Sequence, residues 1–378
     1  MNKELTKEYK DLLLKYRRDL HKIPEIGDDL PKTKEYLLRE LSAMKCQITP
    51  LLNSGIAAFF DFGKSSAVGY RADMDALPIE EANNVDYKST HAGNCHACGH
   101  DGHMAMCLAL CHYINTLEDC PQNVLVIFQP AEETTGGAKF ICKTGIMEKH
   151  ALSCIFGFHL WPFAEEGSIN TRPGALQPKS AEIRIKIYGK AAHATAPTEA
   201  VDALFIACQY IANIDKAHKQ FLPKNPTPEE RTIIQVCKME SGTARNIISG
   251  YTFLLGTLRA FDEDRFTVLV NILKDQAKIL EKEYDCTFDI WHSYGYPPVI
   301  NNLNLYNQIQ PILMTRKFNQ MPEPAMISED YSYYGFHAPS VFFFLGTGTG
   351  IALHSNNFDY EEGILFEGLK LYIDLLYK

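Results

Sequence analysis

One eight-residue stretch, 96–103, contains most of the side-chain types that bind transition metals. It reads His-Ala-Cys-Gly-His-Asp-Gly-His, with one thiol, three imidazoles and one carboxylate. Cysteine and histidine are the ligands that zinc and neighbouring divalent metals prefer. Cys98 and His100 are two residues apart, so a tight turn would let both face one ion. The alternative is a reduced core cysteine among surface histidines, but the density of donors favours a metal site.

Four apolar strands elsewhere in the chain each lead to further residues of metal-binding type. They span 67–70, 123–129, 154–158 and 341–345, and they lead to Asp73 and Asp75, Glu132 and Glu133, His159, and His354. Open α/β sheets place their functional residues at the carboxyl ends of strands. Each end has an ordinary alternative, such as a polar loop or a solvated acidic turn. Together they supply enough ligands for two metal ions and one further carboxylate that need not bind metal. The first of these strands is expected to form a hairpin with an earlier strand over 56–62.

Glu132 and Glu133 are adjacent, which suits two different chemical tasks. Neighbouring residues on extended backbone point to opposite sides. A buried carboxylate at a strand end is costly unless it meets a cation. One glutamate could therefore bind a metal while the other acts as a general base on a metal-bound water.

The composition is that of an ordinary globular protein and argues against several partners. A length of 378 residues favours two domains, and no apolar run approaches the roughly 20 residues that span a bilayer. A net charge of −9 argues against nucleic acid or an anionic membrane as a partner. The first residues are typical of a charged helix rather than a signal peptide, and the cysteines are scattered. We therefore expect a cytoplasmic protein with reduced thiols and with no nucleic-acid or membrane partner.

Between residues 171 and 291 the pattern changes to that of a small separate domain. A strand over 181–188 alternates apolar and polar residues, and the segments after it read as helix, strand, strand, helix and strand. This βαββαβ order is typical of a ferredoxin-like unit. We expect an α/β catalytic domain over 1–176 and 293–378, with a satellite domain inserted over 177–292. The exposed face or edge of the inserted sheet suits pairing with a second copy, so we expect a homodimer.

A series of short motifs runs along essentially the whole chain. In order they are Arg17-Arg18-Asp19-Leu20-His21, Arg71-Ala72-Asp73-Met74-Asp75-Ala76-Leu77-Pro78, His96-Ala97-Cys98-Gly99-His100-Asp101, Gln129-Pro130-Ala131-Glu132-Glu133, Gly157-Phe158-His159, Gly189-Lys190-Ala191-Ala192-His193-Ala194, Arg245-Asn246-Ile247-Ile248 and Leu353-His354-Ser355. This series resembles the aminoacylase/carboxypeptidase family of two-metal metallopeptidases, and within it the amidohydrolase branch. That branch includes N-acyl-amino-acid amidohydrolases, N-acetyldiaminopimelate deacetylases and hippurate hydrolases.

The resemblance implies a role for particular residues. Two divalent ions (Zn, Mn, Ni or Co) would be held by five ligands: Cys98, which would bridge them, His100, Glu133, His159 and His354. Glu132 matches the general base. Asp75 matches a carboxylate that orients a metal-bound histidine, and Asp73 stands where other branches place a histidine ligand. The remaining matches lie in the insert: His193, which would reach the neighbouring subunit's site and polarise the scissile carbonyl, and Asn246 and Arg259, which would contact the substrate carboxylate.

The fold that the resemblance implies is a mixed-sheet, zinc-peptidase-like catalytic domain with the ferredoxin-like insert acting as satellite and dimerisation domain. The implied activity is hydrolysis of the amide bond of N-acyl amino acids, with N-acetyl-L,L-diaminopimelate as one candidate substrate. Two alternatives stay open: an exopeptidase of the dipeptidase or carboxypeptidase type, and a non-catalytic relative that binds N-acyl amino acids. Retention of all five ligands and Glu132 argues against the second alternative.

The chain departs from the family pattern at a few positions. Cys95 adds a second thiol three residues before Cys98. Lys190-Ala191-Ala192 precedes His193 where glycines are common, and Thr198 stands where a second histidine is common. Tyr331 replaces the usual phenylalanine after Ser328-Glu329-Asp330. None of these changes removes a ligand, although substrate preference could differ.

Overall fold

The computed structural model describes residues 3–378, which divide into two compact units. The first unit contains the residues up to 176 together with 300–322 and 330–378, and the second contains 177–299 and 323–329. The segments 293–299 and 323–329, which the sequence-based division gives to the catalytic domain, cluster with the inserted unit. Among the described helices, none combines the length and the apolar character needed to cross a bilayer.

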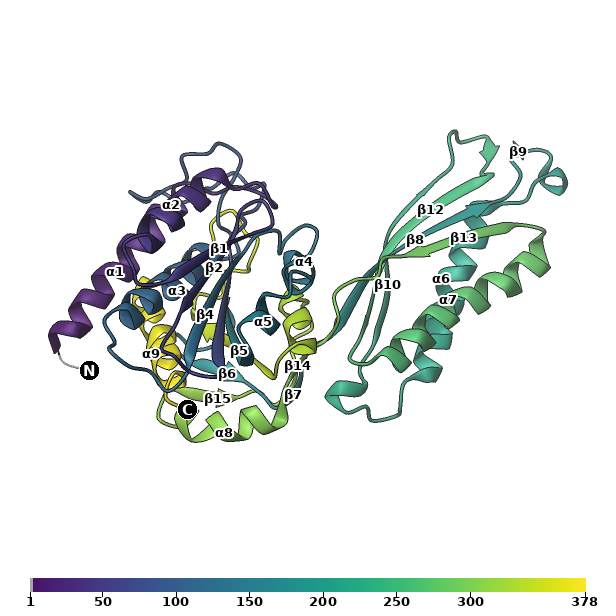
Figure 1. The fold of residues 1–378 in the computed structure, drawn as a ribbon. Helices are drawn as coiled ribbons and strands as arrows, with labels where there is room; N and C mark the ends of the chain where they lie inside the picture. Colours follow the sequence, from purple (N-terminus) through teal and green to yellow (C-terminus); the bar gives the residue numbers. More distant parts are fainter. Residues whose placement is uncertain (1–2) are drawn as a thin grey trace. The chain divides into compact units, whose positions relative to one another are not determined.

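The first unit is built on an eight-stranded mixed sheet (Figure 1). From edge to edge its strands are β1 (Gln47–Leu51), β2 (Gly55–Phe60), β4 (Asn123–Gln129), β3 (Ala67–Asp73), β5 (Leu152–Trp161), β16 (Ser340–Gly346), β6 (Ile169–Thr171) and β15 (Phe318–Gln320). The central strands β4, β3, β5 and β16 run parallel to one another and are almost entirely buried. Their continuous apolar sequences are typical of strands covered on both faces. The carboxyl ends of these four neighbours therefore meet at one end of the sheet.

The expected hairpin between the strands at 56–62 and 67–70 is wrong. Strand β4 lies between β2 and β3, antiparallel to β2 and parallel to β3. Asn123, at the start of β4, holds the connection between them: its side-chain oxygen accepts from the Phe62 and Lys64 amides at 2.8 and 3.1 Å. The local turn sequence indicates a reversal of the chain, but a strand from later in the sequence occupies the place beside it.

Helices cover both faces of this sheet (Figure 1). One face carries α1 (Lys3–His21), α2 (Pro31–Leu41), α3 (His100–Asn115) and α9 (Leu365–Leu375), and the other carries α4 (Gly137–Cys142) and α5 (Ile146–Lys149), while α8 (Leu303–Leu313) lies near the ends of the strands. Helix α3 packs against α1, α9 and the sheet, and its apolar side chains are buried on nearly all sides. Gly99 precedes it with φ 83°, and a Cβ there would lie 2.5 Å from Leu160 Cδ1. Only glycine suits that position.

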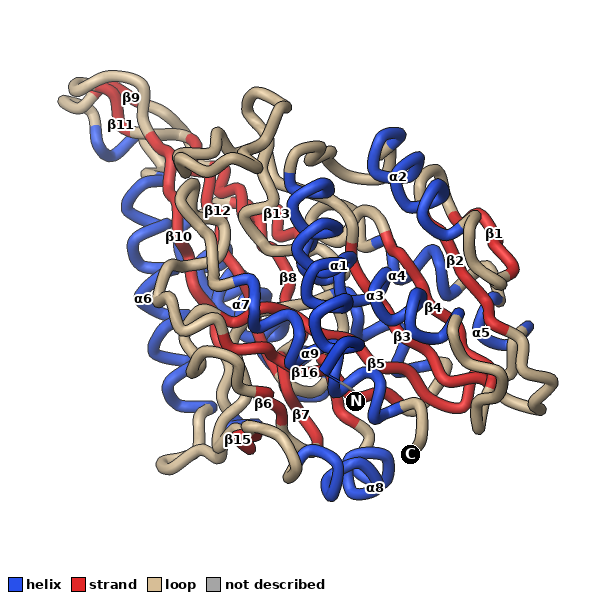
Figure 2. The backbone as a smooth tube through the Cα atoms, turned by 90° about the vertical axis from the view of Figure 1, so that its left-hand side faces the viewer, coloured by secondary structure: helices blue, strands red, loops and turns tan. Residues whose placement is uncertain are grey.

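The second unit has a four-stranded antiparallel sheet covered on one face by two helices. Its elements are β8 (Lys179–Tyr188), β9 (Ala192–His193), α6 (Ala203–Phe221), β10 (Ile233–Ser241), β11 (Ile247–Ile248), β12 (Tyr251–Ala260), α7 (Glu263–Tyr284) and β13 (Thr287–His292). The main sheet has the order β10-β12-β8-β13, and β9 and β11 form a small pair beyond the end where β12 begins (Figure 2). A second small pair, β7 (Gly174–Gln177) and β14 (Val299–Asn301), forms where the chain passes between the units. The predicted mixed α/β fold with a βαββαβ insert is confirmed.

A buried ion-pair network connects α1 to the first turn of α3. The Arg17 side chain is 1% exposed, and its Nε lies 3.2 Å from Asp101 Oδ2. His21 Nδ1 lies 2.7 Å from the same oxygen, and His21 Nε2 lies 3.1 Å from Glu81 Oε1. Because Asp101 directly follows His100, this network holds the turn from which His100 projects.

The network sets the charge of His21. Burial lowers its pKa, but the charge of Asp101 and the hydrogen bonds to Asp101 and Glu81 outweigh this and raise the pKa to about 9. In an unfolded chain the same imidazole titrates near 6.5. The folded state therefore retains this proton where the unfolded state loses it. The resulting stabilisation is complete below about pH 6.5 and is lost as the pH rises through about 9.

We expect the free energy of unfolding to fall over this pH range by up to about 3 kcal/mol in the wild-type protein. His21→Gln should lack that part of the pH dependence, because glutamine does not titrate. Urea unfolding at a series of pH values measures the difference, with His112→Gln on α3 as the control. Parallel curves for the wild type and His21→Gln would contradict the assignment.

Candidate metal centre

The residues expected as ligands come together at the carboxyl ends of the central strands. His159 lies near the end of β5, while Glu132 and Glu133 follow β4 and His354 follows β16. Cys98 and His100 lie on the turn that begins α3. Their candidate ligand atoms form three groups, each with all atoms within 4.8 Å of one another: Cys98, His100 and His159; Cys98, Glu133 and His354; and His100, Glu132 and Glu133. Cys98, His100 and Glu133 each belong to two groups, as expected for one compact site.

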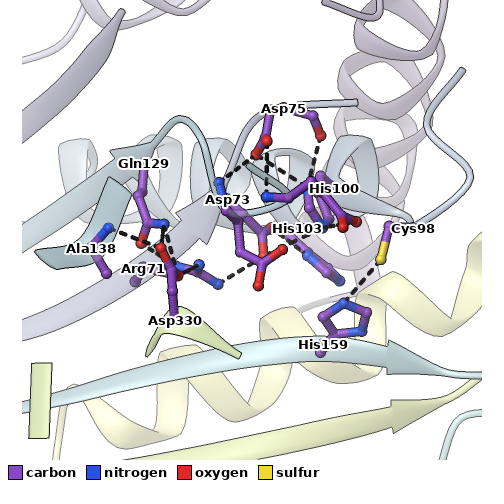
Figure 3. Close-up of polar contacts among 12 residues, drawn as sticks. Arg71, Asp73, Asp75, Cys98, His100, His103, Gln129, Ala138, His159 and Asp330 are labelled. Atoms are coloured by element: carbon purple, nitrogen blue, oxygen red, sulfur yellow. Dashed lines mark hydrogen bonds and ion pairs between the residues drawn. The ribbon is translucent and has the colours of Figure 1, made fainter. Parts of the chain in front are cut away.

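The two buried histidines of this cluster both present Nε2 to its centre. His100 Nδ1 lies 2.8 Å from the backbone carbonyl of Asp75, and His159 Nδ1 lies 2.8 Å from that of Leu160. A carbonyl can only accept, so each Nδ1 carries the proton and each Nε2 has a free lone pair. His159 Nε2 is 3.3 Å from Cys98 Sγ (Figure 3), and His100 Nε2 is buried with no hydrogen-bond partner among residues 3–378. An unpaired buried nitrogen beside a thiol and a carboxylate fits a bound cation.

The electrostatic environment of the cluster also fits a cation. Burial, and then the charges of Glu133 and Glu132, raise the pKa of the Cys98 thiol well above its usual value. Burial lowers the pKa of His159 to about 3, so its imidazole is neutral. Burial alone would raise the pKa of Glu133, but the hydrogen bond with His354 and the interactions with His100 and Cys98 together outweigh it and lower the pKa to about 2. Burial also lowers the pKa of His100, whereas the hydrogen bond to Glu133 raises the pKa of His354. A cation would stabilise the thiolate of Cys98 among these groups.

Two residues at the site have strained backbone. Ala131 and His354 have φ values of 63° and 64°, which side chains other than glycine rarely adopt. The Ala131 carbonyl accepts from the Gly136 and Gly137 amides at 2.9 and 3.1 Å, and the His354 amide donates to the Ala97 carbonyl at 2.9 Å. These hydrogen bonds maintain the strained conformations, as is common where a site requires a fixed geometry.

Asp75 contacts the site differently from the expectation. Its carboxylate accepts from two consecutive amides, with Glu132 N 2.9 Å from Oδ1 and Glu133 N 3.0 Å from Oδ2. The carboxylate oxygen near His100 is 3.8 Å from Nδ1, whereas the Asp75 backbone carbonyl is at 2.8 Å. The backbone of Asp75 thus orients His100, and its side chain holds the turn that carries the two glutamates.

Sequence reasoning missed a second buried network behind the cluster, shown in Figure 3. Arg71, on β3, donates to Asp73 at 2.7 Å and to Asp330 at 2.8 Å. Asp330 begins the short 3₁₀ helix η3 (Asp330–Phe336) and also accepts from the side chain of Gln129, at 2.7 and 2.9 Å to its two oxygens. His103 contacts Asp73 at 2.6 Å. The sequence analysis includes His103 in the stretch 96–103, but no local pattern indicates its contact with Asp73.

The remaining predicted residues lie in the second unit. His193 lies in β9 with its Nδ1 2.8 Å from Thr195 Oγ1, and the backbone carbonyl of Asn246 accepts from the Ala194 amide at 2.9 Å. Arg259 donates to the Met326 carbonyl at 2.6 Å, near the other end of β12. Strand β12 advances by eight residues from 251 to 259, so its two ends are roughly 26 Å apart. Within a single copy of the second unit, His193 and Asn246 are neighbours, and Arg259 is remote from both.

Cys95, the additional thiol, is buried, and burial raises its pKa to about 11. Its backbone is fixed by a pair of hydrogen bonds with Leu77, both at 3.1 Å. At neutral pH this thiol is therefore protonated and weakly reactive.

Comparisons with known proteins agree on one family. A model of peptidase family M20/M25/M40 matches residues 69–378. An uncharacterized hydrolase of Staphylococcus aureus (strain bovine RF122 / ET3-1) is 32% identical over 380 residues, covering 97% of each chain. The fold is similar to that of a provisionally assigned aminohydrolase from methicillin-resistant Staphylococcus aureus, with TM-score 0.90, 25% identity, and 98% of this chain and 97% of that chain covered. It is also similar to the fold of a dinuclear metal-binding peptidase of the M20 family from Bacillus subtilis. That match has a TM-score of 0.84 and 24% identity, and it covers 98% of this chain and 99% of that chain.

We expect Asp75→Asn to loosen the turn that carries Glu132 and Glu133, because an amide offers one acceptor and turns an N–H group toward the other amide. The free energy of unfolding should fall by about 1–3 kcal/mol, the usual effect of leaving a buried donor unpaired. Chemical denaturation measures the change, with Asp119→Asn at an exposed position as the matched control. Equal stability of Asp75→Asn and the control would contradict the bidentate role.

Proposed function

The chain belongs to peptidase family M20/M25/M40 and is a hydrolase, and from this premise we propose that it is a metal-dependent amidohydrolase cleaving the amide bond of N-acyl amino acids. The proposal rests on one observation: Cys98, His100, Glu133, His159 and His354 form overlapping groups, and a further carboxylate, Glu132, lies beside His100 and Glu133. Such a cluster has the ligand number and chemistry for two divalent ions. When bound, the ions would lower the pKa of a water molecule to about 7 and polarise the amide carbonyl.

Glu132 is the candidate general base. It is largely buried, and a carboxylate oxygen lies within 4.8 Å of candidate ligand atoms of His100 and Glu133. The backbone amide of Glu132 is held by Asp75, so the carboxylate is attached to a fixed turn. From this place it would take a proton from the attacking water and pass it to the departing nitrogen. Without that proton the nitrogen is a poor leaving group.

Cys98 would help to hold both ions. Its sulfur belongs both to the group with His100 and His159 and to the group with Glu133 and His354. Because burial and two carboxylates oppose its ionisation, the thiolate would form only with compensating positive charge beside it. Zn, Mn, Ni and Co are the candidate ions.

The placement of the insert residues supports a homodimer. His193 and Asn246 lie at one end of β12 and Arg259 at the other, roughly 26 Å apart. A single copy of the second unit cannot bring both ends of β12 to one small substrate. Two copies related by a two-fold axis could do so, with His193 and Asn246 supplied by one subunit and Arg259 by the other.

We expect Glu132→Gln to lower kcat by at least about 100-fold while the metal content per subunit stays at the wild-type value. Glutamine keeps the shape of the side chain but cannot accept the proton. Metal analysis and amide hydrolysis are measured on the same preparations, with Glu118→Gln at the surface as the control. Unchanged activity would refute the base assignment, and loss of metal together with activity would make Glu132 a ligand instead.

A substrate panel tests the reaction class. The wild-type enzyme with bound metal should release the acyl group from N-acetyl and hippuryl amino acids, with N-acetyl-L,L-diaminopimelate as a specific candidate. Cleavage of dipeptides alone would favour the exopeptidase alternative. Binding of two metal ions with no turnover of any member would favour the non-catalytic alternative.

A mixing experiment tests the shared site. His193→Ala and Glu132→Gln should each be nearly inactive, but subunits of the two variants assembled together should regain up to about a quarter of wild-type activity. Half of the assembled dimers would be mixed, and in each of these one site has both an intact Glu132 and His193 from the partner. A monomer in sedimentation, or no recovery in mixed dimers, would overturn the shared site.

A further inference from the structure

Helix α3 carries a histidine that neither the ligand set nor the proposed reaction uses. His103 is 1% exposed and lies one helical turn after His100. Its ring centroid is 5.4 Å from that of His100 and 4.8 Å from that of His159. A third imidazole thus lies directly against two expected metal ligands, and its own nitrogens decide whether it binds metal or has another role.

The hydrogen bonds of His103 define a single tautomer. The Leu160 amide donates to His103 Nε2 at 3.0 Å, and an amide N–H can only donate, so Nε2 carries no proton. The proton of the neutral ring is therefore on Nδ1, which lies 2.6 Å from Asp73 Oδ1. Both nitrogens are engaged, so His103 has no lone pair left for a metal ion.

Leu160 connects this histidine to the ligand His159. Its amide donates to His103, and its carbonyl accepts from His159 Nδ1 at 2.8 Å. That second bond keeps His159 Nε2 unprotonated, 3.3 Å from Cys98 Sγ. The carbonyl of Leu160 thus sets the tautomer of His159, and His103 binds the amide of the same residue.

Asp73 is held in place as the acceptor for His103. Arg71 Nη1 donates to Asp73 Oδ2 at 2.7 Å, and Nη2 donates to Asp330 at 2.8 Å (Figure 3). Arg71 is itself fully buried, so the carboxylate is confined between two donors.

We propose that His103 is a positioning residue of the metal centre: anchored by Asp73, it holds Leu160 so that His159 presents Nε2 to the metal. The inference rests on the proposed metal-dependent function. It also gives Asp73 a role other than that of the histidine ligand at this position in other branches. Partners that orient a metal ligand typically change metal affinity by about 10- to 100-fold when removed.

Two substitutions at position 103 separate the two hydrogen bonds. His103→Asn places an amide nitrogen near the position of Nδ1 and keeps the donor to Asp73, but it has no acceptor for the Leu160 amide. His103→Gln reaches the position of Nε2 and can supply that acceptor. His112→Asn on the same helix, where the side chain is 31% exposed, controls for the substitution itself.

The first measurement is the affinity for Zn²⁺ by competition with a chromophoric chelator, together with the folded content by circular dichroism. We expect His103→Asn to bind at least about tenfold more weakly, while His103→Gln and His112→Asn stay within about threefold of wild type. Wild-type affinity in His103→Asn, or equal weakening in both variants at position 103, would overturn the proposal. A wild-type protein that binds no metal would instead overturn the proposed function.

The second measurement uses the metal-free wild-type protein, so its outcome does not depend on whether His103→Asn folds. Nitrogen-15 NMR of histidine-labelled protein distinguishes an imidazole protonated on Nδ1 from one protonated on Nε2, and His103→Gln assigns the signal. We expect the Nδ1-protonated tautomer for His103. The Nε2-protonated tautomer, or a charged imidazolium, would overturn the proposal even if metal binding and hydrolysis are as proposed.

Discussion

The structure depends on one constraint, the burial of many polar and ionisable groups at the carboxyl ends of four parallel strands. Cys98, His100 and His159 are almost fully buried there, and Asp73 and Asp75 are completely so. Groups of this kind are stable in an interior only when each is hydrogen-bonded or meets an opposite charge. Backbone amides and neighbouring side chains supply hydrogen bonds to Asp73 and Asp75, whereas His100 Nε2 has no hydrogen-bond partner among residues 3–378. In the proposed site, a cation would satisfy this nitrogen.

Much of the site's geometry comes from the backbone rather than from side chains. Carbonyls of Asp75 and Leu160 set the tautomers of the two buried histidines. Amides of Glu132 and Glu133 bind the Asp75 carboxylate, and the strained Ala131 lies immediately before them. Backbone groups at the ends of a packed parallel sheet move little, because each strand is bonded on both sides. Ligands oriented by such groups are held in place before any ion binds, which reduces the reorganisation that binding requires.

The second unit is organised by the length of its own strands. β12 separates the end with His193 and Asn246 from the end with Arg259, and α6 and α7 cover one face between them. A rigid strand of this length cannot bend to bring its two ends together. If all three residues act on one substrate, they act from two copies of the unit. The proposal of a dimer thus rests on the separation of these residues along β12.

The sequence by itself determined the central strands, the residues that follow their ends and the order of the elements in the insert. Apolar runs, period-two alternation and the dense His/Cys stretch are local signals, and the βαββαβ insert and the mixed α/β class follow from them. Only the tertiary structure decided that β4 lies between β2 and β3, that residues 323–329 cluster with the inserted unit, and that the Asp75 carboxylate accepts from two backbone amides. It also showed that both ring nitrogens of His103 have hydrogen-bond partners, whereas Nε2 of His100 in the same short motif has none among residues 3–378. These outcomes depend on contacts between residues far apart in the chain, and local patterns contain no information about which distant donor or acceptor will lie opposite a given atom.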